Sequence, residues 1–281
     1  LEHPTSARTM NNLAALYDSI GAYDRAEPLF AHALSIRDKV LGPEHPDTAA
    51  SMNNLAALYR SSGDYVKAEA LYVQALALTE KALGPVHPDT ALALNNLALL
   101  YVSTGAYAKA DPLYARARSI VEIALGPRHR NVATILNNTA ALYRSMGQYE
   151  IAEPLYIRAL DITEEALGPD HPETATTLNN LALLYHLTNE NSKARPLYVR
   201  ALAIREKTLG SEHPSTATTL NNLAGLYGAM GDNAQAQLLF ARALVVIEKA
   251  LGPEHQAAAT SLNNLSVLMW ATGDLEKAQP M

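Results

Sequence analysis

The sequence predicts an all-α solenoid in which one pair of antiparallel helices is repeated along the chain, and three observations predict it. Histidine and an Asn-Asn pair both recur every 42 residues, seven times in a chain of 281. Each period holds two segments whose apolar residues have helical spacing, and none with the sustained alternation of a strand. Glycine or proline stands where each segment should end. The recurring histidines are His3, His45, His87, His129, His171, His213 and His255.

The first helix of the pair, helix A, is expected at residues 47–62 of the second repeat. Met52, Leu55 and Tyr59 lie on one face of such a helix, because their spacing follows the helical turn. Gly63 then supplies a residue that tolerates the left-handed conformation and ends the helix.

The second helix, helix B, is expected at residues 65–83, with Ala68 and Tyr72 on its apolar face. The carboxylate of Asp64 can cap its start, and Gly84 stops it. In four repeats a proline falls some four residues into helix B, although proline is harmless only in the first turn. Either helix B starts later there, or its first turn is distorted. These prolines are Pro28, Pro112, Pro154 and Pro196.

The repeats should share one core, because neither helix can bury its apolar stripe alone. All fourteen tyrosines fall on three positions of the repeat, which we predict to be core positions. The chain starts and stops inside a repeat, so we expect it to be cut from a longer array. The shortened last helix B, near Trp270, should leave an apolar face that favours end-to-end self-association. We predict a single array over residues 1–281, with repeats at 3–44, 45–86, 87–128, 129–170, 171–212, 213–254 and a truncated repeat at 255–281.

Composition narrows the class of protein. Hydrophobic residues make up 48% of the chain and charged residues 18%, which is enough apolar surface for a continuous core. The net charge of −6 gives no basic face for nucleic acid, and no apolar run is long enough to cross a membrane. The absence of cysteine excludes disulfides and thiolate metal sites. We therefore expect a cytoplasmic protein that binds neither nucleic acid nor membranes.

The segments that follow one another in the fifth and sixth repeats resemble the tetratricopeptide repeat. They are residues 201–210 (ALAIREKTLG), His213-Pro214, residues 217–224 (ATTLNNLA) and Leu226-Tyr227. The 42-residue length is similar to that of the kinesin light chain repeats. This resemblance implies a right-handed superhelix whose A helices line a concave groove, in which kinesin light chains hold extended peptides.

The first asparagine of each pair is predicted to point into this groove. The resemblance places it there, and the spacing agrees, since Asn53 and Ala57 share the stripe opposite the core residue Leu55. An amide both donates and accepts, so it can pair with an extended backbone of any sequence. An amide can instead pin one repeat to the next, and we favour that role for the second asparagine, such as Asn54. The predicted peptide-binding asparagines are Asn11, Asn53, Asn95, Asn137, Asn179, Asn221 and Asn263.

Arg60, Arg144 and His186 occupy one repeat position on the same stripe. They can form a mildly basic track that binds acidic segments through charge-assisted hydrogen bonds. The alternative is a solvated helix face without a partner, and Asp18 at the same position argues against a uniform track. In the sixth repeat Gly225 and Gly228 replace larger residues, and they can open space in the groove for a bulky side chain.

The recurring histidines suggest metal at first sight, but histidines of neighbouring repeats should lie at least ~8–10 Å apart, the spacing of packed helices. They cannot share an ion whose ligands lie ~2 Å away. We predict that they pack in the linker and form a hydrogen bond at the start of helix A, with no metal and no cofactor. The sequence also contains no phosphate loop and no HExxH motif.

The predicted function is a protein–protein interaction scaffold that binds extended peptide segments and is not an enzyme. One alternative is a sensor or regulatory segment of a larger multidomain enzyme or signalling protein, and another is a self-associating solenoid. The fourth repeat departs most from the pattern. Thr139 replaces a core leucine, Arg118 replaces a helix B leucine just before it, and no proline follows His129. We expect the array to bend there.

Overall fold

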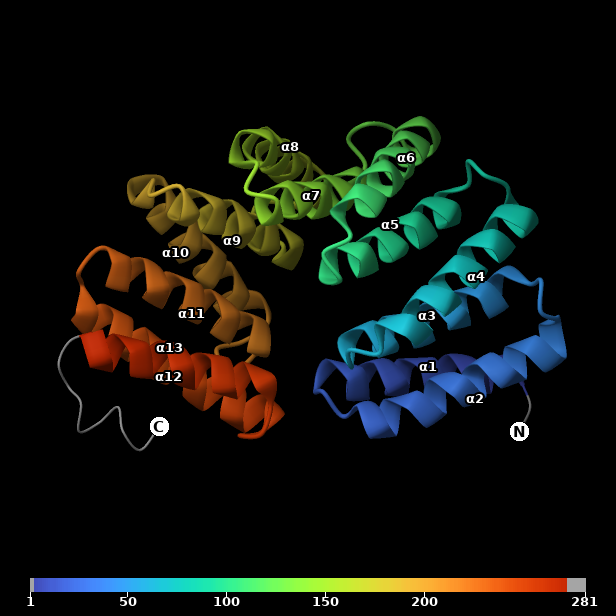
Figure 1. The fold of residues 1–281 in the computed structure, drawn as a ribbon, viewed down its shortest axis with the longest axis horizontal. Coiled ribbons are helices and arrows are strands. Elements are labelled where there is room, and N and C mark those ends of the chain that lie inside the picture. The colour runs from blue at the N-terminus through green and yellow to red at the C-terminus, as the bar shows by residue number, and fades with distance from the viewer. Residues whose placement is uncertain (1–2, 272–281) are drawn as a thin grey trace. The chain divides into compact units, whose positions relative to one another are not determined.

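The computed structural model describes residues 3–271, and within that range it consists of thirteen helices without a strand (Figure 1). A and B helices alternate along the chain, as the repeat predicts. The A helices are α1 (Pro4–Ser19), α3 (Pro46–Ser61), α5 (Pro88–Ser103), α7 (Arg130–Ser145), α9 (Pro172–Leu187), α11 (Pro214–Ala229) and α13 (Gln256–Ala271). The B helices are α2 (Tyr23–Leu41), α4 (Tyr65–Leu83), α6 (Tyr107–Leu125), α8 (Tyr149–Leu167), α10 (Asn191–Thr208) and α12 (Asn233–Leu251).

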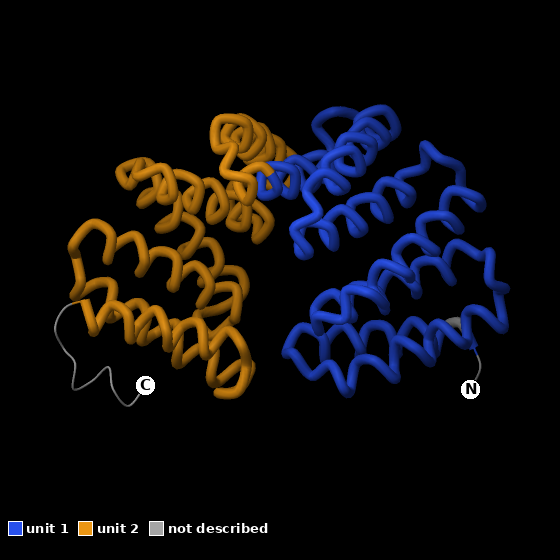
Figure 2. The backbone as a smooth tube through the Cα atoms, in the orientation of Figure 1, with its two compact units in different colours: residues 1–142 blue, residues 143–281 orange. Residues whose placement is uncertain are grey.

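The chain divides into two compact units, residues 1–142 and residues 143–281 (Figure 2). We call them the N-terminal unit and the C-terminal unit. The division falls inside α7, in the fourth repeat, where the sequence departs most from its pattern. Thr139 is buried there, and its hydroxyl donates to the carbonyl of Ile135 at 2.7 Å in its own helix. The single array over residues 1–281 stays a prediction.

The recurring histidines define where the A helices begin. In all seven, Nδ1 accepts a hydrogen bond of 3.1–3.2 Å from the backbone N–H two residues further on. The predicted hydrogen bond at the start of helix A is thus confirmed. An accepting Nδ1 directs its lone pair at the helix start, which leaves Nε2 as the ring nitrogen that can donate a hydrogen bond. A buried threonine adds a second tie: Thr90 donates to the carbonyl of Gly84 at 2.8 Å, and Thr174 to that of Gly168 at 2.9 Å.

The helix ends follow the predicted turn chemistry. Gly63 and Gly84 have φ of 85° and 95°, the left-handed region in which a side chain is strained. Asn189 takes the place of the first of these glycines in the fifth repeat and adopts φ 61°. Asp64 caps α4, because its carboxylate accepts from the N–H of Lys67 at 3.3 Å.

The structure shows that the four prolines inside helix B do not delay the start of the helix. Each proline is the sixth residue of its helix, and α2, α6, α8 and α10 run through it. All four prolines are exposed, so water can reach the carbonyl that the missing N–H leaves without its helical partner. None of these four helices has a side-chain cap, whereas α4 and α12, which lack the proline, are capped by Asp64 and Asp232.

Three kinds of tyrosine position emerge. The helix B tyrosines are the centre of the core, with exposed fractions of 0–1%; they are Tyr72, Tyr114, Tyr156 and Tyr198. The tyrosines near the end of helix A join neighbouring repeats: the hydroxyl of Tyr101 donates to Glu69 at 2.8 Å, and that of Tyr185 to Glu153 at 2.8 Å. The third position is at the start of helix B, and it is not buried in every repeat, because Tyr65 is 40% exposed. There the prediction is wrong: Tyr65 is the first residue of its helix and lies at the edge of the stack.

Candidate functional site

The A helices of neighbouring repeats contact one another within each unit, α3 with α5 in the first and α9 with α11 and α11 with α13 in the second. Asn53, Ala57 and Arg60 are one turn apart on the side of helix A away from Leu55. We call this row and its equivalents in the other repeats the inner stripe. Two hollows lie beside residues of this stripe, one in each unit, and each is a candidate site by itself.

The larger hollow, of about 620 Å³, lies in the C-terminal unit over α9, α11 and α13. We call it the α9–α13 hollow. Gly225 and Gly228 line it, and Phe240 reaches it from α12. A methyl group added at Gly225 would meet no atom within 4 Å, so the missing side chain is what keeps the space open. At Gly228 an added methyl group would lie 3.6 Å from Leu268, so the open space is at Gly225. That this space receives a bulky side chain of a partner stays a prediction.

Polar groups surround this apolar floor. Asn221 and Asn263, two of the predicted asparagines, line the α9–α13 hollow together with the second members of their pairs. His186 also lines it, and its Nδ1 lies 3.3 Å from Oδ1 of Asn191. The hollow thus offers an aromatic floor beside several amides, a combination that can take a large apolar side chain and pair with the backbone that carries it.

The asparagine pairs also connect neighbouring repeats. Asn138 donates to Oδ1 of Asn95 at 2.9 Å, and Asn222 donates to Oδ1 of Asn179 at 3.1 Å. The pinning role of the second asparagine is therefore confirmed at these two places. Its partner, however, is the first asparagine of the preceding repeat, so the two members of a pair do not have separate roles.

The predicted peptide-binding asparagines differ in exposure. Asn11, Asn95 and Asn179 are only 5–7% exposed. Asn53, Asn137 and Asn221 are half-buried, and Asn263 is exposed. Asn53 donates to the carbonyl of Ala49 in its own helix at 3.3 Å, and Asn221 donates to Ser261 at 2.8 Å. Peptide binding by this row stays a prediction, and the exposed Asn263 is the member best placed for it.

The predicted basic track is half-buried and lies against the tyrosine core. The charge of Arg144 reaches Tyr156 and Tyr198, whose hydroxyls have no hydrogen-bond partner among residues 3–271. Burial raises the pKa of Tyr156 to about 12, against the opposing effect of Arg144. In the N-terminal unit, burial raises the pKa of the Asp18 carboxyl, and the charge of Arg60 opposes that shift. Whether Arg60, Arg144 and His186 hold an acidic partner stays a prediction.

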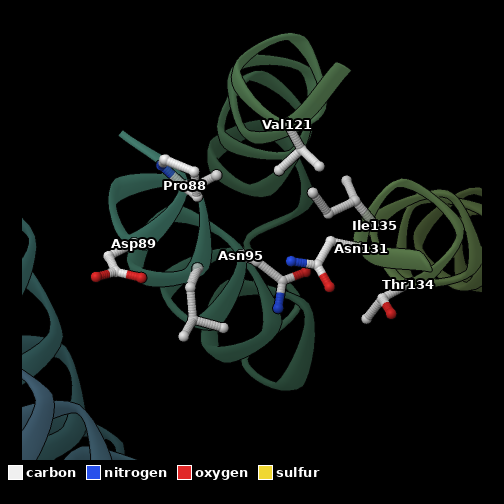
Figure 3. Close-up of a pocket in the computed structure, with 9 residues that line it drawn as sticks. Pro88, Asp89, Asn95, Val121, Asn131, Thr134 and Ile135 are labelled. Atoms are coloured by element: carbon white, nitrogen blue, oxygen red, sulfur yellow. The ribbon is translucent and has the colours of Figure 1, made fainter. Parts of the chain in front are cut away.

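The smaller hollow, of about 240 Å³, lies in the N-terminal unit between α5 and α7 (Figure 3). We call it the α5–α7 hollow. Val121 of α6 and Ile135 of α7 approach it from one side and Asn95 from α5, while Asp89 lies at its outer rim (Figure 3). Of its lining residues the sequence singled out only Asn95. The signal that could have found it is the repeat position of Val121, which holds arginine in two other repeats.

Neither hollow contains the ligands of a metal centre. Over residues 3–271, no three side chains of histidine, cysteine, aspartate or glutamate gather closely enough to hold an ion. No helix in the same range has the length and hydropathy needed to span a bilayer.

A comparison with protein families tests the resemblance to known repeat proteins that the 42-residue period suggested. The tetratricopeptide repeat profile matches six overlapping stretches, residues 5–81, 53–123, 89–156, 131–207, 192–244 and 215–281. The chain belongs to the tetratricopeptide repeat family. Members of this family are protein-interaction scaffolds, and stacked repeats present the extended surfaces that such scaffolds use.

Solved structures place this tetratricopeptide repeat protein near the kinesin light chain type. BtubC (BKLC) from P. vanneervenii is 29% identical with a TM-score of 0.63, covering 86% of this chain and 94% of its own. A putative kinesin light chain from Podosopora anserina with nearly identical TPR-like repeats is 28% identical with a TM-score of 0.57, covering 74% and 99%. The Rap protein complexed with Competence and Sporulation Factor shares the fold at 14% identity, with a TM-score of 0.66 and coverage of 97% and 76%. No curated protein matches the sequence.

Proposed function

We propose that this tetratricopeptide repeat protein binds an extended segment of a partner protein along the inner stripe of its C-terminal unit. The α9–α13 hollow receives one large apolar side chain of that segment. The observation that carries the proposal is the hollow itself, which is open because Gly225 stands where Leu183 and Val267 stand in the neighbouring repeats.

The chemistry of the lining supports an apolar anchor. Phe240 takes the place that Tyr198 holds one repeat earlier, so the floor carries no hydroxyl. Burial of an aromatic side chain removes ~150–250 Å² from water, which is worth roughly 4–6 kcal/mol before the cost of ordering the segment. The exposed amide of Asn263 can pair with the backbone beside the anchor.

The fold comparison supports a protein partner in general terms. The Rap structure is of a complex with Competence and Sporulation Factor, and another structure with this fold, Cut9-Hcn1, is a hetero-tetramer of APC/C. Such likeness concerns the fold, so the partner of this chain must be identified through its own site.

A peptide-array screen tests the proposal. The protein is applied to arrays of extended peptides, and bound peptides should share a large apolar residue. Gly225→Leu fills the hollow from a position with no neighbouring atom within 4 Å, so the variant should fold and lose that selection. Gly225→Ala is the matched control and should keep it. Equal selection by the Leu variant and the wild-type protein would show that the hollow is not the anchor site.

Self-association through α13 is a second candidate, and the exposure of Trp270 favours it. This side chain is 71% exposed, which is unusual for a large aromatic residue. The shortened helix B that was expected to leave an apolar face lies outside the described residues. Light scattering should show a mass that rises with concentration, and Trp270→Ser should abolish the rise. A constant monomeric mass at all concentrations would rule the candidate out.

A further inference from the structure

One position near the end of helix B differs sharply in chemistry between repeats. It points toward the first turns of the next helix A, and it holds either a long cation or a short side chain. Its six occupants are Arg37, Thr79, Val121, Thr163, Arg205 and Ile247.

The two arginines make the same pair of hydrogen bonds. Nη1 of Arg37 donates to the carbonyl of Asp47 and to the hydroxyl of Ser51, both at 2.9 Å. Nη1 of Arg205 donates to the carbonyl of Ser215 at 2.7 Å and to the hydroxyl of Thr219 at 2.6 Å. The first turns of the next helix A thus provide a place for a guanidinium group, which is held there by neutral oxygens.

Arg205 shows how completely this place encloses the group. Its side chain is only 6% exposed, and Nη2 donates at 3.2 Å to the hydroxyl of Thr176 in α9. The protein therefore keeps a cation buried there without a carboxylate bonded to it, since all three acceptors are neutral oxygens.

The α5–α7 hollow is the equivalent place in a repeat that has no arginine at this position. Val121 stands at the arginine position, and Asn131 and Ile135 stand where Asp47 and Ser51 stand against Arg37. Leu92, the equivalent of Thr176, lines the hollow too. Figure 3 shows Val121 and Ile135 on one side of the space, with the amides of Asn95 and Asn131 beside it.

We propose that the α5–α7 hollow binds an arginine side chain of a partner segment, which takes the place that Arg37 and Arg205 fill in their own repeats. The aliphatic stem packs on Leu92 and Val121. The guanidinium donates to the carbonyl of Asn131, whose equivalents accept from both internal arginines. The inference rests on the proposed function in that the partner is a protein segment.

The surroundings of the hollow favour a guanidinium over other groups. The hydroxyl of Thr134 is exposed on the lining, and it retains lone pairs while donating to the carbonyl of Arg130. Asp89 also lines the hollow, but its carboxylate lies 3.7 Å from Nδ1 of His87 and points away from Val121 and Asn131 (Figure 3). A planar fork of N–H donors reaches several such oxygens at once, whereas an ammonium group acts as a point charge.

The test uses the arginine side chain alone as its probe. N-acetyl-arginine amide is titrated into the methyl-labelled protein, with N-acetyl-citrulline amide as the neutral isostere. The methyl signals of Val121, Leu92 and Ile135 should shift with the arginine compound and respond at least ~10-fold more weakly to citrulline, the factor that about 1.4 kcal/mol represents. Equal shifts with both compounds, or shifts confined to other methyl groups, would overturn the proposal.

Variants make the test specific to this hollow. Val121→Arg combined with Ile135→Thr rebuilds the arrangement of Arg205 and Thr219, so the protein should supply its own guanidinium and lose the response at Leu92. Val121→Thr, the residue of the second and fourth repeats, is the matched control and should keep it. Leu92→Trp narrows the hollow from a side chain that is 57% exposed, and it serves if the double variant does not fold.

Arginine binding to the α5–α7 hollow can be tested independently of peptide binding to the α9–α13 hollow. Gly225→Leu alters only the α9–α13 hollow, so it should leave the arginine titration unchanged. A response that survives both Leu92→Trp and the double variant would show that arginine binds elsewhere.

Discussion

The α5–α7 hollow and the α9–α13 hollow both form where a smaller side chain replaces a larger one of the repeat, but the replaced side chains differ. In the first, Val121 leaves out the arginine that Arg205 supplies four helices later. In the second, Gly225 and Gly228 leave out side chains of helix A, and Phe240 leaves out a hydroxyl. One omission leaves a small space between the apolar side chains of Leu92, Val121 and Ile135, with polar groups of Asn95, Asn131 and Thr134 at its sides. The other leaves a larger space that Phe240 borders.

The difference teaches that recurring residues and departing residues have different tasks in this chain. The capping histidines, the buried tyrosines and the glycines of the turns recur because every repeat needs the same helix ends and the same core. A binding site needs something that only one repeat has. The comparison therefore predicts large, similar effects from changes to recurring residues, and local effects from changes at the hollows.

The largest expected effect comes from removal of core aromatics in the two regions. Tyr114→Ala and Phe240→Ala should each destabilise the fold by roughly 3–5 kcal/mol. The loss should be smaller for Phe240, because its side chain is 5% exposed and borders the hollow, whereas Tyr114 is 0% exposed. Urea unfolding followed by circular dichroism measures both, and a larger loss at Phe240 would contradict the open floor.

The pH dependence of stability separates buried tyrosines from the rest of the scaffold. The folded protein raises the pKa of Tyr101, Tyr156 and Tyr185 to about 12, mainly through burial, while the unfolded chain ionises near 10. Between these values the unfolded state binds fewer protons, so stability is full below pH 10 and falls as pH rises.

Tyr156→Phe should therefore be close to wild type at neutral pH and more stable than wild type in the alkaline range. Its hydroxyl has no hydrogen-bond partner in the part of the chain that the structure describes, so its removal costs little. Thermal melts at a series of pH values provide the measurement. An equal slope of stability against pH in both proteins would mean that Tyr156 ionises normally when folded.

The histidine caps should contribute equally in both regions. His87→Ala and His171→Ala each remove one acceptor at the start of a helix A, which should cost about 1 kcal/mol in either case. Replacement by asparagine, which can also accept at this position, should restore most of the loss. Urea unfolding measures the stability of the four variants. A clear difference between the stability losses of the two alanine variants would show that the caps do not contribute equally.

The smallest expected effect distinguishes two kinds of glycine. Gly225→Ala should stabilise α11 by ~0.5–1 kcal/mol, because the glycine lies in a helix and the added methyl group meets open space. Gly84→Ala should instead destabilise by about 1 kcal/mol or more, because φ is 95° there. Thermal melts of the two variants should shift in opposite directions, and a shared direction would contradict this distinction.

Local features of the fold could be predicted from the sequence. The bounds of α4, the conformation of Gly63, the histidine caps and the space at Gly225 each depend on residues close together in the chain or on one missing side chain. The role of the second asparagine in joining repeats could be predicted, but not that Asn138 donates to Asn95, because the choice of partner depends on how one repeat is placed against the next. The α5–α7 hollow escaped for the same reason: a single valine is unremarkable until Arg205 shows what its position can hold.

A double-mutant cycle between the protein and its partner tests the central claim most directly. A peptide selected by the array is made with its apolar anchor intact or changed to alanine, and calorimetry measures both against the wild-type protein and Gly225→Leu. If the anchor occupies the α9–α13 hollow, the two changes should be coupled by at least ~1.4 kcal/mol, a tenfold difference in affinity. Additive losses, with no coupling, would show that the anchor binds elsewhere.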